Sequence, residues 1–94
     1  MADESLKELG KRIRQRRKAL GWSQEAFALE AEIDRSYVGG VERGQRNVSF
    51  TNLLRLCEAL QITATELLAA AQADRDWGDG VSGLPASSRR RRAA

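Results

Sequence analysis

Histidine is absent from this 94-residue sequence, and cysteine occurs once, as Cys57. A single cysteine cannot form a disulfide within the chain, and without histidine there is no plausible set of zinc ligands. The same shortage leaves no nucleophile with a neighbouring base, which argues against an enzyme. We therefore expect no cofactor and no small-molecule ligand, and we expect Cys57 to be a small buried hydrophobic residue in a reducing cytoplasm.

Long apolar runs are missing as well. No stretch approaches the roughly 20 apolar residues of a membrane span, and residues 1–4 lack the basic and apolar regions of a signal peptide. β-rich alternating runs and internal repeats are also absent. The 41% hydrophobic and 31% charged residues are spread along the chain, as in a folded domain. These features predict an all-α cytoplasmic protein with no membrane partner.

Positive charge is distributed unevenly. The formal net charge is +3, but the run Arg89–Arg92 supplies four positive charges, and the remainder is about −1 without it. Residues 1–22 contain seven Lys or Arg and three acidic residues. Overall charge is therefore weak evidence for a nucleic-acid partner, whereas its concentration at one end of the domain is informative. The terminal run is either a solvated charged end or an accessory arm that binds phosphates.

Apolar residues recur at helical spacing in five segments of residues 1–73. We predict helices over about 6–20, 24–31 and 35–43, a fourth from Ser49 or Thr51 to about Gln61, and a fifth from about 63 to 73. The supporting signals are capping boxes at Ser5–Glu8 and Thr63–Glu66, N-caps at Ser23 and Asp34, and stops at Gly21 and Gly44. The prediction is a compact five-helix bundle, followed by a flexible basic tail over 74–94.

The two short central helices are separated by only three residues, Glu32–Asp34, and the second is polar on its outward side. Two helices joined by such a tight turn form a helix-turn-helix, whose second helix enters the major groove of DNA. The alternative is an ordinary helical hairpin without a binding function. The outward residue types favour the helix-turn-helix, over residues of about Ser23 to Glu42.

Base-reading residues are expected at the start of the second helix. Arg35, Ser36 and Tyr37 offer a guanidinium fork for guanine, a hydroxyl and an aromatic edge. Gly39 and Gly40 follow in mid-helix, although each costs roughly 1 kcal/mol there relative to alanine. We predict that they let the helix backbone approach a groove wall. The alternative is that they allow close packing or a kink.

Phosphate contacts are expected on both sides of that helix. Ser23 and Gln24 lie at the first turn of the preceding helix, where free N–H groups and the helix dipole favour a phosphate. Arg43, Arg46 and Asn47 lie just beyond the second helix, within reach of flanking phosphates. The alternative for these three residues is a solvated charged loop.

Residues of about Leu9 to Leu68 resemble the lambda-repressor-like (XRE) helix-turn-helix family. The similarity lies in I-R-Q-R-R at 13–17, G-W-S-Q-E at 21–25 and V-E-R-G at 41–44. The run D-R-S-Y-V-G-G-V-E-R-G-Q-R-N-V-S at 34–49 is similar to the controller proteins of restriction–modification systems. Such proteins regulate their own operon, which includes the endonuclease gene.

The resemblance implies a five-helix bundle that dimerises through its C-terminal helices and places the third helix in the major groove. The DNA contacts that it implies are Gln24, Arg35, Ser36, Tyr37, Arg46 and Asn47. It also implies a structural ion pair between Arg17 and Glu42. Arg16 departs from the family pattern, because many members have an apolar residue there, so packing or the pairing of Arg17 is expected to differ.

A homodimer is also expected from the apolar surface of the last two helices, which exceeds what a small core can hide. The expected interface residues are Phe50, Leu54, Ile62, Leu67 and Leu68. A two-fold dimer would bind double-stranded DNA at a pseudo-palindromic operator. Two alternatives remain open: an antitoxin that neutralises a toxin protein and represses its own operon, and an architectural protein indifferent to sequence.

Overall fold

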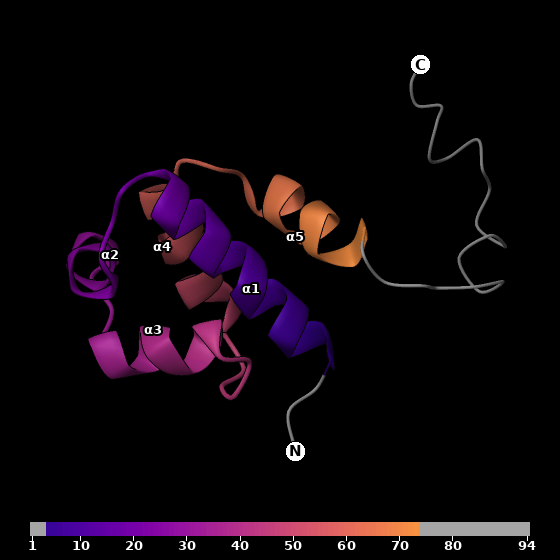
Figure 1. The fold of residues 1–94 in the computed structure, drawn as a ribbon, viewed down its shortest axis with the longest axis horizontal. Coiled ribbons are helices and arrows are strands. Elements are labelled where there is room, and N and C mark those ends of the chain that lie inside the picture. Colours follow the sequence, from indigo (N-terminus) through magenta and orange to yellow (C-terminus); the bar gives the residue numbers. More distant parts are fainter. Residues whose placement is uncertain (1–3, 74–94) are drawn as a thin grey trace, which may run out of the picture.

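The computed structural model describes residues 4–73, which form five packed helices (Figure 1). They are α1 (Glu4–Ala19), α2 (Gln24–Ala31), α3 (Arg35–Glu42), α4 (Phe50–Leu60) and α5 (Ala64–Ala73). All regular structure within 4–73 is helical, so the predicted all-α bundle is confirmed. None of the described helices is long and apolar enough to cross a membrane. The predicted tail over 74–94, with its run Arg89–Arg92, lies outside the described residues.

Capping residues start the last two helices largely as predicted. Ser49, rather than Thr51, caps α4, since its Oγ accepts a hydrogen bond from the N–H three residues later at 3.2 Å. Thr63 and Glu66 form a reciprocal capping box at α5, and the hydrogen bond from the Thr63 N–H lowers the pKa of the Glu66 carboxyl. The box predicted to begin the first helix is wrong, because Ser5 already lies inside α1.

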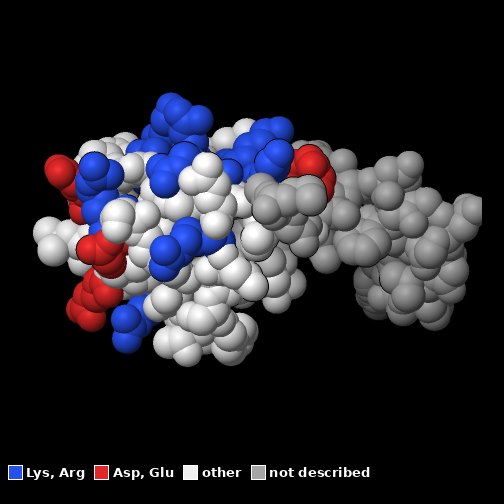
Figure 2. Space-filling view, turned by 90° about the horizontal axis from the view of Figure 1, so that it is seen from below, with Lys and Arg blue, Asp and Glu red and all other residues white. Residues whose placement is uncertain are grey.

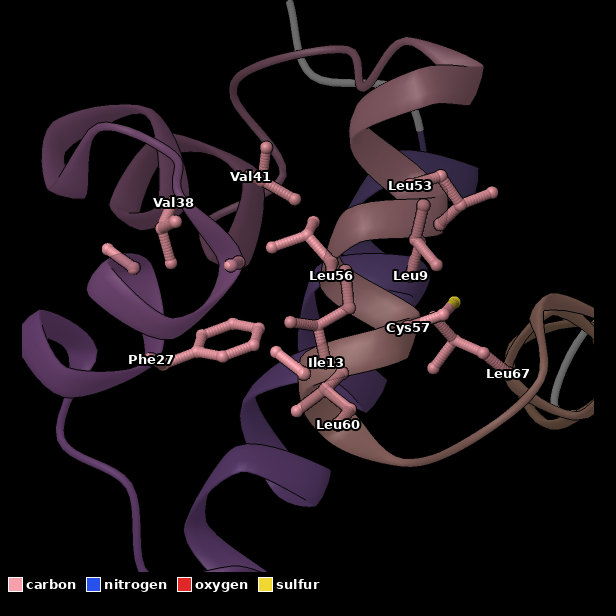
Figure 3. Close-up of a cluster of buried hydrophobic side chains, with 13 residues drawn as sticks. Leu9, Ile13, Phe27, Val38, Val41, Leu53, Leu56, Cys57, Leu60 and Leu67 are labelled. Carbon is pink, nitrogen blue, oxygen red and sulfur yellow. The ribbon is translucent and has the colours of Figure 1, made fainter.

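All five helices contribute side chains to the hydrophobic core (Figure 3). Ile13, Phe27, Leu56 and Leu60 are fully buried there. Burial of each such side chain stabilises the fold by about 1.5–3 kcal/mol. Cys57 is also buried, as predicted, and burial raises the pKa of its thiol. The thiol is therefore part of the packing.

Helix α1 crosses the end of α3 at close range, and Gly10 makes this approach possible. A Cβ at Gly10 would meet the backbone carbonyl oxygens of Val41 and Glu42 and would lie 2.8 Å from the Glu42 carbonyl carbon. Neither oxygen belongs to a side chain that could rotate away. Any larger residue at position 10 would therefore push α1 and α3 apart.

The side chain of Arg16 contacts the end of α4. Its Nε donates to the Leu60 carbonyl at 2.9 Å, and its Nη2 donates to the Gln61 carbonyl at 3.1 Å. These carbonyls end α4, where helical partners are no longer available and a positive charge is favoured. Arg16 thus joins α1 to the turn between α4 and α5, and it leaves the pairing of Arg17 undisturbed.

The expected dimer surface needs one correction. Leu67 is only 1% exposed and belongs to the core, so it is not available at the surface. Leu67 and Leu68 are adjacent on α5 and point in different directions, and only Leu67 faces inward. Phe50 is 70% exposed, and Leu54 and Leu68 are also exposed. Ile62 is partly buried against the core.

Candidate nucleic-acid interface

The segment between α2 and α3 turns the chain within three residues. Glu32 adopts a left-handed conformation with φ of 60°. Asp34 then caps α3, because its carboxylate accepts hydrogen bonds from the backbone N–H groups of Ser36 and Tyr37. The Ser36 hydroxyl donates to the same carboxylate, and this bond, followed by the two backbone bonds, lowers the pKa of Asp34. The predicted helix-turn-helix is present.

A chain of polar contacts connects the core to the first residue of α3. Arg17 Nε and Nη2 donate to the carboxylate of Glu42 at 2.7 and 3.0 Å, and both residues are 7% exposed. The implied ion pair is therefore present. Gln24 Nε2 donates to Glu42 Oε1 at 3.0 Å, and Gln24 Oε1 accepts from Arg35 Nη1 at 3.3 Å. A buried carboxylate thus orients Gln24, and Gln24 in turn contacts Arg35.

A second group of residues lies where the chain leaves α3. The guanidinium carbon of Arg46 lies 5.2 Å from the centre of the Tyr37 ring, which is within the range of a cation–π contact. The Tyr37 hydroxyl donates to the Asn47 carbonyl at 3.1 Å. Tyr37 therefore ties the loop that follows α3 back to the helix.

The two glycines of α3 do not present bare backbone to solvent. Both are buried. A Cβ at Gly39 would lie 3.1 Å from Arg43 Nη1, and a Cβ at Gly40 would overlap the aliphatic part of Arg46. The expected open glycine face is absent from this conformation, and the glycines instead allow two arginine side chains to lie close over the helix. The approach of Gly39 and Gly40 to a groove wall of DNA stays a prediction, because it requires these flexible arginine side chains to move aside.

The other residues predicted to contact DNA differ in the hydrogen bonds and ion pairs that they form within the protein. Ser23 Oγ accepts from the Ala26 N–H at 3.0 Å and so caps α2. Arg43 Nε donates to Gln45 Oε1 at 2.8 Å, on the exposed surface. Arg35 is also exposed and lies 3.8 Å from Glu25. The hydroxyl of Ser23 is therefore structural, whereas the guanidinium groups are held only at the surface.

The charge distribution places these arginines within a larger positive surface. Figure 2 shows the face that lies at the bottom of Figure 1, with Lys and Arg across its top and centre and a group of Asp and Glu at its left edge. A hollow of about 560 Å³ opens between α1 and α3, and its lining residues are Arg14, Arg17, Gln24, Glu42 and Arg43. Three of these five residues are arginines, so an anionic ligand would be favoured at its rim.

Sequence reasoning missed two parts of this arrangement. The hydrogen bond between Gln24 and Glu42 joins residues 18 positions apart, and no local pattern indicates it. Gly10 was a detectable signal, because a lone glycine inside a helical pattern often marks a close approach of another backbone. Both features determine how α1 and α2 support α3.

The helix-turn-helix family model matches residues 13–67. The match covers more than half of the chain. The chain therefore belongs to the helix-turn-helix family, and the lambda-repressor-like pattern predicted from its motifs is confirmed.

Specific relatives narrow the resemblance to controller proteins. Control protein C.MunI of a Mycoplasma species is 45% identical over 47 residues, which are 50% of this chain and 64% of that protein, less than two thirds of its length. The crystal structure of the restriction–modification controller protein C.AhdI from Aeromonas hydrophila has 56% sequence identity and a TM-score of 0.65, and the match covers 66% of this chain and 94% of that chain. The biofilm regulator SinR in complex with DNA has 33% identity and a TM-score of 0.62, over 64% of this chain and 97% of that chain.

Proposed function

We propose that this protein is a sequence-specific, DNA-binding transcriptional regulator that controls a restriction–modification operon. In this proposal it acts in the cytoplasm as a homodimer on a pseudo-palindromic operator. The main support is the start of α3, where exposed Arg35 contacts Gln24 and Gln24 is oriented by the buried Arg17–Glu42 pair. The similarity to C.MunI and C.AhdI supports the controller assignment.

The proposed roles follow from position on α3. Arg35, Ser36 and Tyr37 at its N-terminal end would read base edges, since this end of a recognition helix enters the major groove. Arg46 and Asn47, in the loop beyond α3, would contact phosphates. Gln24, Ser23 and Arg43 would do the same near the start of α2 and the end of α3, where backbone N–H groups and guanidinium groups meet the DNA backbone.

Arg35→Ala and Arg46→Ala are expected to fail in different ways. Loss of Arg35 should cost about 1–3 kcal/mol on the specific operator and relax one base position in each half-site, with little change on random DNA. Loss of Arg46 should weaken binding to both duplexes alike and flatten the dependence of log K on log salt by about one unit per lost phosphate contact. Titration of both variants against both duplexes at several salt concentrations separates the two roles. An Arg35→Ala variant that binds the operator like the wild type would contradict the groove-reading role of α3.

The proposed dimer uses the exposed apolar residues of α4 and α5. Phe50→Asp should convert the dimer to a monomer, because a charge would be buried in an apolar interface, and sedimentation at micromolar concentration measures this directly. Leu29→Asp is the matched control for Phe50→Asp, because Leu29 is 80% exposed on α2, outside this surface. A wild type that sediments as a monomer with and without DNA would refute the dimer.

The proposed two-fold dimer also predicts the form of its operator. Selection from random oligonucleotides should return a pseudo-palindrome with half-site centres roughly 34 Å apart for the wild type.

A further inference from the structure

The exposed side of α1 carries positive charges that lie outside the helix-turn-helix. Lys7, Lys11, Arg14 and Lys18 form what we name the α1 stripe, and all four are exposed. Their spacing of four, three and four residues places them on one face of the helix. Eleven residues of helix separate the first from the last, a distance of about 16 Å. In Figure 2 positive side chains extend along the top of the view. The top of Figure 2 corresponds to the front of Figure 1, where α1 lies.

The α1 stripe differs from the other cations of the same helix in its lack of protein partners. Arg12 pairs with Glu8 at 3.4 Å, Arg16 caps the end of α4, and Arg17 pairs with buried Glu42. Within residues 4–73, no ion pair or hydrogen bond engages the side chains of the α1 stripe. The charged groups of these side chains therefore stabilise no ion pair within the described fold, and their charge is available to a ligand.

The α1 stripe is continuous with the helix-turn-helix. Arg14 lines the 560 Å³ hollow together with Gln24 and Arg43. Lys11, Arg14 and Lys18 line an adjoining hollow of about 450 Å³. At the N-terminal end of the α1 stripe, Lys7 lies close to Gly44, the glycine that follows α3. A Cβ added at Gly44 would lie only 2.6 Å from Lys7 Cα. One positive surface thus runs from α3 and the start of α2 onto α1.

We infer that the α1 stripe binds DNA phosphates outside the base pairs that α3 contacts, and so extends the footprint into the flanking duplex. This inference rests on the proposed DNA-binding function. Duplex DNA presents one negative charge per roughly 1.7 Å of its axis, so phosphates continue along the α1 stripe beyond each half-site. Lysine suits this role because its ammonium is a flexible point charge that contacts phosphate without reading sequence. The contacts add affinity and salt dependence, with no added specificity.

The test compares two duplexes that contain the operator recovered by selection. One is cut at the operator ends, and the other has roughly 10 additional base pairs, one helical turn, on each side. The wild type should bind the extended duplex more tightly and with a steeper salt dependence. Lys11→Gln combined with Lys18→Gln should reduce the slope of log K against log salt on the extended duplex by about 0.9 per lost contact, or about 3.6 for the two contacts of each protomer in the proposed dimer. Binding to the trimmed duplex should not change.

Arg12→Gln combined with Arg55→Gln is the matched control, because it removes the same charge from positions beside Glu8 and beside the Glu32 carbonyl. This control should leave both slopes unchanged, and thermal unfolding should show that both double variants fold. Two results would overturn the inference while leaving operator binding intact. One is an equal reduction of the salt slope by the two double variants, and the other is equal affinity of the wild type for the extended and trimmed duplexes. Failure of the wild type to prefer any selected duplex over random DNA would overturn the proposed function and this inference together.

Discussion

Glu42→Gln is expected to lower the free energy of unfolding by about 3–5 kcal/mol, because it leaves the guanidinium of Arg17 buried without a counterion. The side chain of Glu42 is only 2% exposed and that of Arg17 is 9% exposed, so water cannot replace the lost charge. Domains of this kind are stable by about 5–15 kcal/mol in total. Urea unfolding followed by circular dichroism should therefore show a much lower midpoint, with part of the population unfolded in buffer.

Two controls test whether the loss arises from the buried charge. Glu25→Gln removes an exposed carboxylate 3.8 Å from Arg35, and the change should be below about 1 kcal/mol. Arg17→Met combined with Glu42→Leu replaces both charges by apolar groups, which should restore most of the stability. A Glu42→Gln variant that unfolds like the wild type would show that Arg17 finds another partner or water.

The double replacement also separates folding from DNA binding. Without Glu42, Gln24 loses the acceptor that orients its amide, and Arg35 loses the fixed neighbour that holds it. Under the proposed function, the restored protein should fold but bind its operator more weakly. The buried pair would then act on recognition through Gln24 and not only through stability.

Gly10→Ala is expected to cost about 3 kcal/mol of stability, at the upper end of the range for overpacked contacts. Its new methyl group would meet the backbone carbonyls of Val41 and Glu42, and backbone cannot rotate out of the way. The gain of about 1 kcal/mol that alanine normally brings to a helix would not compensate. Thermal or urea unfolding of the purified variant measures the net change.

Gly39→Ala is the matched control for this substitution. It is also a glycine inside a helix, but its nearest neighbour is the end of the flexible Arg43 side chain at 3.1 Å, which can move. We expect a change of less than about 1 kcal/mol in either direction. Equal effects at positions 10 and 39 would contradict the interpretation that backbone contact makes Gly10 essential.

The sequence was most informative where the determining contact is local. Ser23, Asp34 and the Thr63–Glu66 box each bond within three residues, so their side-chain types predict the helix starts. Ser49 and Thr51 were both plausible caps, and only the observed bond from Ser49 resolved the choice. The sequence also predicted that the proposed base-reading residues share one helix, α3, because they are neighbours in the chain.

The sequence was less informative about which of two neighbouring residues is buried. Leu67 and Leu68 have the same chemistry and adjacent positions, and the packing of α5 against α1 decides that Leu67 is buried. Gly39 and Gly40 suggested open backbone, but the lengths of Arg43 and Arg46 allow both side chains to fold over them. Side-chain placement of this kind depends on neighbours that periodicity does not identify.

The sequence by itself determined the five helices, their main caps and the helix-turn-helix, because capping, helical periodicity and short turns depend on residues a few positions apart. The tertiary structure alone decided which backbone Gly10 meets, which leucine of α5 is buried and how Glu42 orients Gln24. It also placed the α1 stripe beside α3, although the two segments are more than 15 residues apart in the chain. These relations arise from helices packing at short range across long sequence separations, where the geometry of the whole bundle selects the partners.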